Sequence, residues 1–152
     1  MFYRPVKSVM QRRNVAKASP QISVAQAARL MAKKNVGAVL IIDDGRLVGI
    51  VTERDIVFRV AARGLDIATT AVADVMTRSP HSIEPDVPLG YALMIMHDKG
   101  FRHLPVIDNG QLVGIVSARS AMDPDLEEFE SEAQRRRHFL AQHEARRAAS
   151  PS

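Results

Sequence analysis

Cysteine is absent from all 152 residues of the chain. This absence excludes disulfide bonds, catalysis by a thiol and metal sites built from thiolates. It does not by itself identify the compartment in which the protein works.

Segments that direct a chain into or across a membrane are also missing from the sequence. It has no run of about 18 apolar residues, no short apolar stretch behind a basic amino terminus and no small-residue cleavage pattern. We therefore expect a cytoplasmic protein that makes no contact with a membrane.

The motifs of common catalytic sites do not occur either. The sequence contains no HExxH zinc motif, no Walker phosphate loop and no GxSxG serine motif. Its histidines are scattered along the chain rather than clustered as ligands: His81, His97, His103, His138 and His143. We therefore expect no metal site, no catalytic cofactor and no enzymatic activity.

The sequence does contain enough apolar residues for a folded core, 46% of the chain, and an unevenly distributed net charge of +4. Five basic residues and no acidic one lie within residues 1–17: Arg4, Lys7, Arg12, Arg13 and Lys17. A solvated basic arm and a surface for a polyanion both fit this pattern, and the arm is the simpler interpretation. Nucleic acid is therefore the less favoured partner.

The sequence repeats itself once. The stretch LVGIVTERD at 47–55 returns as LVGIVSARS at 112–120. Three pairs of residues are each separated by 65 positions: Gly45 and Gly110, Gly49 and Gly114, and Arg54 and Arg119. Apolar residues with helical spacing recur at the same interval: Val24, Ala27, Ala28 and Met31, then Leu89, Ala92, Leu93 and Met96. A constant interval of this kind indicates an internal duplication.

Helix signals occur at equivalent positions of the two copies. Ser23 followed by Gln26 is a capping-box pattern, so it predicts a helix start in the first copy. The remaining signals are a helix start at Asp86 and Pro88 and helix ends at Asn35 and Gly100. The segment ERDIVFRVAARG, residues 53–64, predicts a further helix that ends at Gly64.

Strand signals flank a tight turn in each copy. The dipeptides Asp44-Gly45 and Asn109-Gly110 predict type I′ hairpins, because their backbones tolerate positive φ angles. The strands expected around them are 37–42, 46–51, 103–107 and 111–116. Each copy therefore runs short strand, helix, strand, hairpin, strand, helix. Because one copy alone cannot cover its sheet, the predicted fold is a mixed α/β (α+β) body in which the copies pack sheet to sheet about a pseudo-twofold axis.

At this point the chain resembles a known family, the tandem cystathionine-β-synthase (CBS) domains of a Bateman module. The motifs that carry the resemblance are Val9-Met10, Val75-Met76, GIVTERDI at 49–56 and FRHLPVIDNGQLVGIVS at 101–117. The resemblance covers residues 6–122. The expected organisation is an amino-terminal arm at 1–5, CBS units at 6–66 and 72–122, a carboxyl-terminal helix at 124–147 and a disordered tail at 148–152.

The resemblance implies regulation rather than catalysis. Members of this family sense adenosine-containing ligands such as AMP, ADP, ATP, NAD(H) or S-adenosylmethionine, and they commonly pair as antiparallel dimers. It therefore implies a freestanding homodimeric module whose dimer shape responds to an adenosyl ligand and acts on an unknown client protein. A ligand-independent dimerisation scaffold is the alternative.

Two interpretations apply to the polar end of LVGIVTERD. Thr52 and Asp55 can cap the following helix, because a hydroxyl accepts from free N–H groups and a carboxylate favours the positive end of the helix dipole. The same pair can bind the two hydroxyls of a ribose, which is what the resemblance implies. The two roles are compatible. The site that the resemblance implies comprises Ile50, Thr52, Arg54, Asp55, Pro80, His81, Ser82, Ile83, Arg102 and His103.

A second, weaker site is implied by the duplication. It comprises Ala16, Lys17, Ala18, Gly37, Ala38, Ser117, Arg119 and Ser120. Ser120 stands where the first site has Asp55, and Gly37-Ala38 replaces Arg102-His103. A charge-assisted hydrogen bond contributes about 1.5–3 kcal/mol, so its loss lowers affinity by about one to two orders of magnitude. We expect one good site per chain.

The carboxyl-terminal helix has an apolar stripe. Leu126, Phe129, Ala133 and Leu140 share one face, which Arg136 interrupts. This stripe is compatible with docking on the module or on a dimer mate, and equally with a helix that faces solvent.

Overall fold

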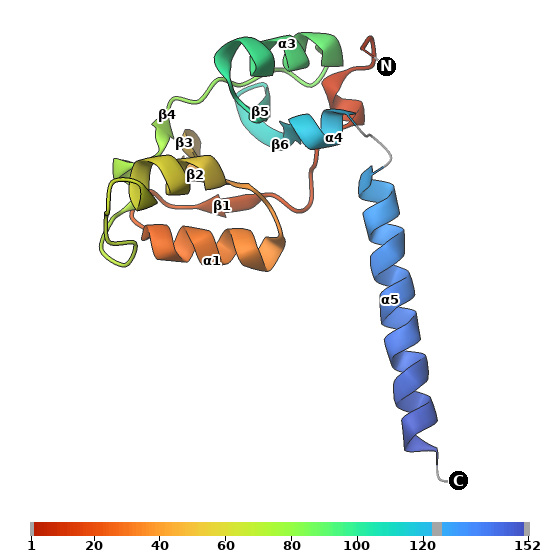
Figure 1. Ribbon diagram of the computed structural model, residues 1–152. Coiled ribbons are helices and arrows are strands. Elements are labelled where there is room, and N and C mark those ends of the chain that lie inside the picture. The colour runs from red at the N-terminus through yellow and green to blue at the C-terminus, as the bar shows by residue number, and fades with distance from the viewer. Residues whose placement is uncertain (1, 123–125, 151–152) are drawn as a thin grey trace. The chain divides into compact units, whose positions relative to one another are not determined.

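The computed structural model describes residues 2–122 and 126–150. The chain divides into a mixed α+β unit, Met1–Ala121, and a carboxyl-terminal unit, Met122–Ser152, which contains the long helix α5 (Figure 1). The predicted fold class, with two repeats of strands and helices and a carboxyl-terminal helix, is confirmed.

The first repeat contains the predicted elements in the predicted order. They are β1 (Ala16–Ala18), α1 (Val24–Lys34), β2 (Ala38–Asp43), β3 (Arg46–Thr52), α2 (Glu53–Asp55) and η2 (Ile56–Ala61). Helix α1 begins at the predicted capping box, because Ser23 Oγ accepts from the Gln26 N–H at 3.1 Å and Gln26 Oε1 accepts from the Ser23 N–H at 2.9 Å. It ends at Asn35, whose φ of 52° lies in the left-handed region.

The second repeat contains α3 (Leu89–Lys99), β5 (His103–Asp108), β6 (Gln111–Ser117) and α4 (Ala118–Met122), in the same order as their counterparts in the first repeat. Strand β4 (Thr77–Arg78) precedes them and pairs with β3 of the first sheet. Short 3-10 turns, η1 (Val6–Ser8) and η3 (Val72–Asp74), precede the two repeats. The predicted first strand is reduced to one isolated bridge between Ile83 and Val106, because Pro85 and Pro105 carry no N–H with which to extend the pairing on either side.

Both predicted hairpins are present. Asp44 and Gly45 have φ angles of 50° and 73°, and Asn109 and Gly110 have φ angles of 49° and 77°. Positive φ at both central residues defines the type I′ turn, whose twist matches that of the flanking strands. The strands β2 with β3 and β5 with β6 pair antiparallel in equivalent registers.

The helix predicted over 53–64 is present, but its longer part has the hydrogen-bond pattern of a π-helix. A single turn, α2, passes directly into the π-helix η2. The Ala62 N–H donates to the Val57 carbonyl at 2.9 Å, and the Leu65 N–H donates to the Val60 carbonyl at 3.1 Å, both five residues back. Apolar spacing over so short a segment does not distinguish the two patterns. Such π turns are frequent beside functional sites.

The entry segment of each repeat pairs with the sheet of the other repeat. Strand β4 pairs with β3, which completes a four-stranded sheet in the order β1-β2-β3-β4. Gln11 forms an isolated antiparallel bridge with Ile115 of the second sheet, β5-β6. In the same way Val72, Val75 and Met76 lie in the core under the first sheet, and Val6, Val9 and Met10 lie in the core under the second. Each core therefore needs residues from both repeats.

A third apolar cluster lies between the two sheets. Its buried members are Ala38, Leu40, Ile50 and Ile115, with Val15, Leu47 and Leu112 packed against them. Because these residues come from both hairpins, the predicted sheet-to-sheet packing is confirmed. Burial of each large aliphatic side chain contributes about 1.5–3 kcal/mol, so this cluster stabilises the packing of the two sheets.

Helix α5 spans Leu126–Ala149, two residues beyond the predicted end at 147 and into the segment predicted to be disordered. Residues 124–125 of the predicted helix and residues 151–152 of the predicted tail lie outside the described residues. The side chains of Leu126 and Phe129 are outside them too, and Leu140 is exposed. Docking and solvent exposure therefore remain open for the apolar stripe.

Within residues 2–122 and 126–150, no helix combines the length and the apolar character that crossing a membrane requires.

Candidate ligand-binding site

A cleft of about 680 Å³ lies between the end of β3 and the start of β5. It is lined by Ile50, Thr52, Glu53, Arg54, Asp55, Val57, Phe58, Arg59, Thr77, Pro80, His81, Lys99, Gly100, Phe101, Arg102 and His103. The structure thus brings together eight of the ten residues predicted for the first site. This volume is in the range of about 300–1,000 Å³ that small-molecule sites occupy.

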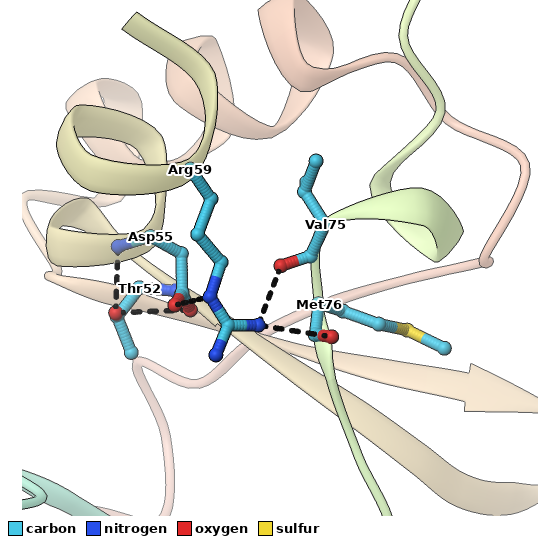
Figure 2. A network of polar contacts seen from close by, with 5 residues as sticks. All are labelled: Thr52, Asp55, Arg59, Val75 and Met76. Carbon is cyan, nitrogen blue, oxygen red and sulfur yellow. Dashed lines mark hydrogen bonds and ion pairs between the residues drawn. The ribbon is translucent and has the colours of Figure 1, made fainter. Parts of the chain in front are cut away.

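Thr52 and Asp55, which both line this cleft, form a reciprocal capping box (Figure 2). Thr52 Oγ1 accepts from the Asp55 N–H at 3.3 Å, while the Thr52 N–H and hydroxyl donate to Asp55 Oδ2 at 2.9 and 3.1 Å. The Asp55 side chain is 13% exposed. The capping interpretation is therefore confirmed, and the carboxylate still borders the cleft.

Arg59 completes the polar network, and the sequence analysis did not single it out. Its Nε lies 3.5 Å from Asp55 Oδ1, and its Nη1 donates to the carbonyls of Val75 at 3.2 Å and Met76 at 3.5 Å (Figure 2). The available signal was its position four residues after Asp55, a spacing that places two helical side chains together. Its two carbonyl partners could not be inferred in this way.

Apolar side chains also line the cleft. Phe58 is 60% exposed, and Val57 beside it is exposed as well. The guanidinium of Arg54 lies 5.0 Å from the centre of the Phe58 ring, a cation–π contact that holds both side chains at the cleft. With Ile50 and Phe101, these residues give the cleft apolar lining in addition to its charged groups.

Arg102 and His103 line the same cleft. Burial lowers the pKa of His103 below 6.5, Glu53 opposes this shift, and Arg102 adds to it. His103 Nδ1 is buried without a hydrogen-bond partner among the described residues. A Cβ added at Gly37 would lie 3.0 Å from Glu53 Oε1 and 3.4 Å from His103 Cε1, so this glycine packs closely against both.

The charges on the cleft favour an anionic ligand. The cations are Arg54, Arg59, Lys99 and Arg102, and the acids are Glu53 and Asp55. Lys99, Gly100 and Phe101 were not predicted, although they directly precede Arg102 in the sequence. Within the described residues, no group of three or more His, Cys, Asp or Glu side chains could hold a metal ion.

Two predicted residues do not line the cleft. Ser82 is exposed to solvent outside the cleft. The Ile83 side chain is buried in the core under the second sheet. The backbone of Ile83 is also occupied, since its N–H donates to the Pro105 carbonyl at 3.0 Å and its carbonyl accepts from the Ile107 N–H at 2.9 Å. Alternation along an extended strand turned this side chain inward.

None of the residues predicted for the second site lines the cleft. Ala16 and Ala38 are buried in apolar clusters, Lys17 and Arg119 are exposed, and Ala18, Gly37 and Ser117 are half-buried. Ser120 is 8% exposed. Ser117 and Ser120 form the same capping pattern as Thr52 and Asp55: the Ser120 N–H donates to Ser117 Oγ at 3.1 Å, and the Ser117 N–H donates to Ser120 Oγ at 3.2 Å.

Both repeats match a known domain family, and the chain is similar to several curated proteins. The sequence pattern of the CBS domain family matches residues 6–62 and 72–124. An uncharacterized 17.7 kDa protein of Acidianus ambivalens is 43% identical over 102 residues, 66% of this chain and 60% of that protein. The CBS domain-containing protein YhcV of Bacillus subtilis is 40% identical over 103 residues, 68% of this chain and 73% of that protein.

A relative in Schizosaccharomyces pombe, meiotically up-regulated gene 70 protein, is 38% identical over 113 residues, 67% of this chain and 16% of that protein. The matched region thus spans less than two thirds of the Acidianus protein and a small part of the yeast protein.

Solved structures share the fold. The CBS domain pair of protein MJ0100 in complex with 5-methylthioadenosine and S-adenosylmethionine is 26% identical, with a TM-score of 0.73 over 83% of this chain and 98% of that one. Protein PAE2072 of Pyrobaculum aerophilum, complexed with AMP, is 27% identical, with a TM-score of 0.69 over 76% and 88%.

A hexameric CBS-CP12 protein from bloom-forming cyanobacteria is 27% identical, with a TM-score of 0.73 over 90% and 85%. Both repeats match the family pattern, and the fold agrees with these structures, so this chain belongs to the CBS domain family.

Proposed function

We propose that the cleft beside Thr52 and Asp55 binds an adenosine-containing ligand and that the protein is a regulatory module rather than an enzyme. The candidate ligands are AMP, ADP, ATP, NAD(H) and S-adenosylmethionine. The observation that carries this proposal is that one cleft combines a ribose-compatible carboxylate, apolar side chains and four cations.

Each part of an adenosyl ligand has a chemically suitable surface. The Asp55 carboxylate accepts hydrogen bonds, as acidic residues do for ribose hydroxyls in dinucleotide-binding folds. Phe58 and Ile50 offer apolar area to a purine ring. Arg102 offers a planar fork of donors to a phosphate, and His103 adds a donor whose charge depends on pH.

The structural relatives support the adenosyl part of this proposal. One was solved with AMP and another with 5-methylthioadenosine and S-adenosylmethionine. These three compounds have adenosine in common and differ in the group at the 5′ carbon. Adenosine is therefore the chemistry we assign to the cleft.

A ligand-independent scaffold is the second candidate, and one observation favours it. The hydrogen bonds of Thr52 and Asp55 to each other already give both side chains a structural role. On this hypothesis the repeats serve only to present surfaces to partners, and Asp55 is a helix cap.

A binding panel separates the two candidates. Calorimetric titration of the full chain with AMP, ATP, NAD and S-adenosylmethionine, with GMP and CMP as controls, should show binding of at least one adenosyl compound and weaker binding of the controls. The scaffold would be established if no adenosyl compound binds and if none of these compounds changes the melting temperature of an Asp55→Ala variant.

We further propose that the ligand acts by shifting a homodimer between two arrangements. A ligand biases such an equilibrium only if it binds one arrangement more tightly than the other. The cleft is lined by residues of both repeats, so a change in how the repeats are arranged alters the site.

The assembly state has to be measured, because one structural relative is hexameric. Sedimentation velocity with and without AMP measures it, and an unchanged profile would contradict this mechanism. The client protein remains to be identified.

A further inference from the structure

Arg59 contacts groups from two separate parts of the chain. It lies on η2, and its ion pair with Asp55 would, on an exposed helix, leave the guanidinium free to move. Here the Val75 and Met76 carbonyls accept from Nη1 and fix it (Figure 2). Val75 and Met76 belong to the segment that enters the second repeat and packs into the first core. Arg59 therefore connects the edge of the cleft to this entry segment.

The two oxygens of Asp55 have different partners. Oδ2 accepts both hydrogen bonds from Thr52, and Oδ1 faces Arg59 Nε at 3.5 Å. A carboxylate has about four acceptor positions, so Oδ1 keeps acceptor capacity for a ligand. Because one oxygen is held by Thr52 and the other is oriented by Arg59, the carboxylate has little freedom to rotate.

The second repeat lacks both members of this pair. Ser120 stands 65 positions after Asp55, and Pro124 stands 65 positions after Arg59. The arginine and the carboxylate thus occur together in the repeat whose strand end borders the cleft. If these two residues were needed only to cap a helix, we would expect them in both repeats.

We propose that Arg59 is a positioning residue for the ribose end of the cleft: it orients Asp55 Oδ1 toward the 2′ and 3′ hydroxyls and anchors that orientation to the entry segment at Val75–Met76. This inference rests on the proposed function. A preorganised carboxylate binds a diol better than a mobile one, because less rotational freedom is lost on binding.

The test compares three probes in calorimetric titrations: AMP, 2′-deoxyadenosine monophosphate and adenosine. Wild type should prefer AMP over the 2′-deoxy compound by about tenfold to a hundredfold. In Arg59→Met this preference should shrink to about threefold or less, while the preference for AMP over adenosine changes little. Arg59→Lys should lie between, because lysine keeps the charge and lacks the planar fork.

Two controls separate positioning from general damage. Arg63→Met removes an exposed arginine from the turn that follows the same helix and should leave both preferences unchanged. In an Asp55→Asn background, Arg59→Met should have no further effect on the ribose preference, since the two residues act as a unit. Circular dichroism checks that each variant is folded, and Arg59→Lys provides the comparison if Arg59→Met is not.

The inference is wrong if Arg59→Met lowers the melting temperature and keeps the full ribose preference, which would make the arginine a structural tie. It is also wrong if the preference for AMP over adenosine collapses while the ribose preference persists, which would make Arg59 a phosphate-binding residue. Both outcomes leave adenosyl binding by wild type intact. If the wild type does not bind AMP, the inference is wrong because the ligand binding on which it rests does not occur.

Discussion

Strands β3 and β6 end in the same geometry with different chemistry. After β3, Thr52 caps the helix and the Thr52 N–H donates to a carboxylate oxygen of Asp55 at 2.9 Å. After β6, Ser117 caps the helix and the Ser117 N–H donates to the hydroxyl oxygen of Ser120 at 3.2 Å. A hydroxyl therefore closes the box as well as a carboxylate does. The fold needs two caps, and it does not need the negative charge of Asp55.

The largest expected effect comes from replacing Asp55 of the first repeat by serine, the residue type at the equivalent position of the second repeat, Ser120. Asp55→Ser should lower the affinity for AMP by about tenfold to a hundredfold, because it removes a charge-assisted hydrogen bond. The free energy of unfolding should change by about 1 kcal/mol or less, since serine at Ser120 makes the same cap. Calorimetry and urea unfolding measure the two quantities.

Asp43→Ser is the matched control, because Asp43 is an exposed aspartate at the end of β2. It should leave affinity unchanged. If Asp55→Ser lost stability and retained full affinity, Asp55 would be a cap alone, and the contrast between the two repeats would have no functional meaning.

The next effect concerns two glycines that occupy equivalent places in β3 and β6. A Cβ at Gly114 would lie 2.7 Å from the Gln11 carbonyl oxygen, whose backbone is fixed by hydrogen bonds of 2.8 and 3.0 Å to Ile115. A Cβ at Gly49 would instead meet the flexible side chain of Met76. Gly114→Ala should therefore cost about 1–3 kcal/mol of stability, and Gly49→Ala clearly less.

Urea unfolding of both glycine variants measures this difference. Equal losses would show that the two entry segments, at Gln11 and at Met76, are held with equal rigidity and that the repeats are more alike than the contacts indicate.

The smallest effect is a pH dependence that only one repeat should show, because His103 stands where the first repeat has Ala38. Burial lowers the pKa of His103 below 6.5, so between this lowered value and 6.5 the unfolded state binds more protons than the folded state. The free energy of unfolding should therefore fall as the pH drops below 6.5. His103→Asn should reduce this dependence.

Urea unfolding at about pH 7.5 and about pH 5.5 measures the slope, with the exposed His97→Asn as control. An unchanged slope in His103→Asn would mean that the histidine is charged in the folded protein or is accessible to water.

The elements predicted from the sequence depend on local chemistry. The capping box at Ser23, the left-handed residue Asn35 and the Asp44-Gly45 turn all appear where their side chains and backbone preferences required them. The constant interval of 65 positions then related the second repeat to the first. These signals span a few residues each, so no tertiary information was needed to read them.

The features that the sequence analysis missed depend on contacts between distant residues. Arg59 reaches the cleft because carbonyls 16 and 17 residues away hold it there. Ile83 lies in the core because its backbone bridges Val106. The exchange of entry segments between the sheets is likewise a tertiary arrangement that periodicity does not encode. Assignment of the binding residues to a ligand stays a prediction.

The unequal repeats lead to one central claim, that each chain has one good adenosyl site, at Asp55. Calorimetric titration of the full chain with AMP tests it most directly, through the number of ligands bound per chain and the loss of affinity in Asp55→Ala. We predict one tight site per chain, which Asp55→Ala weakens at least as much as Asp55→Ser does. Two equal sites per chain, or a tight site that survives Asp55→Ala, would contradict it.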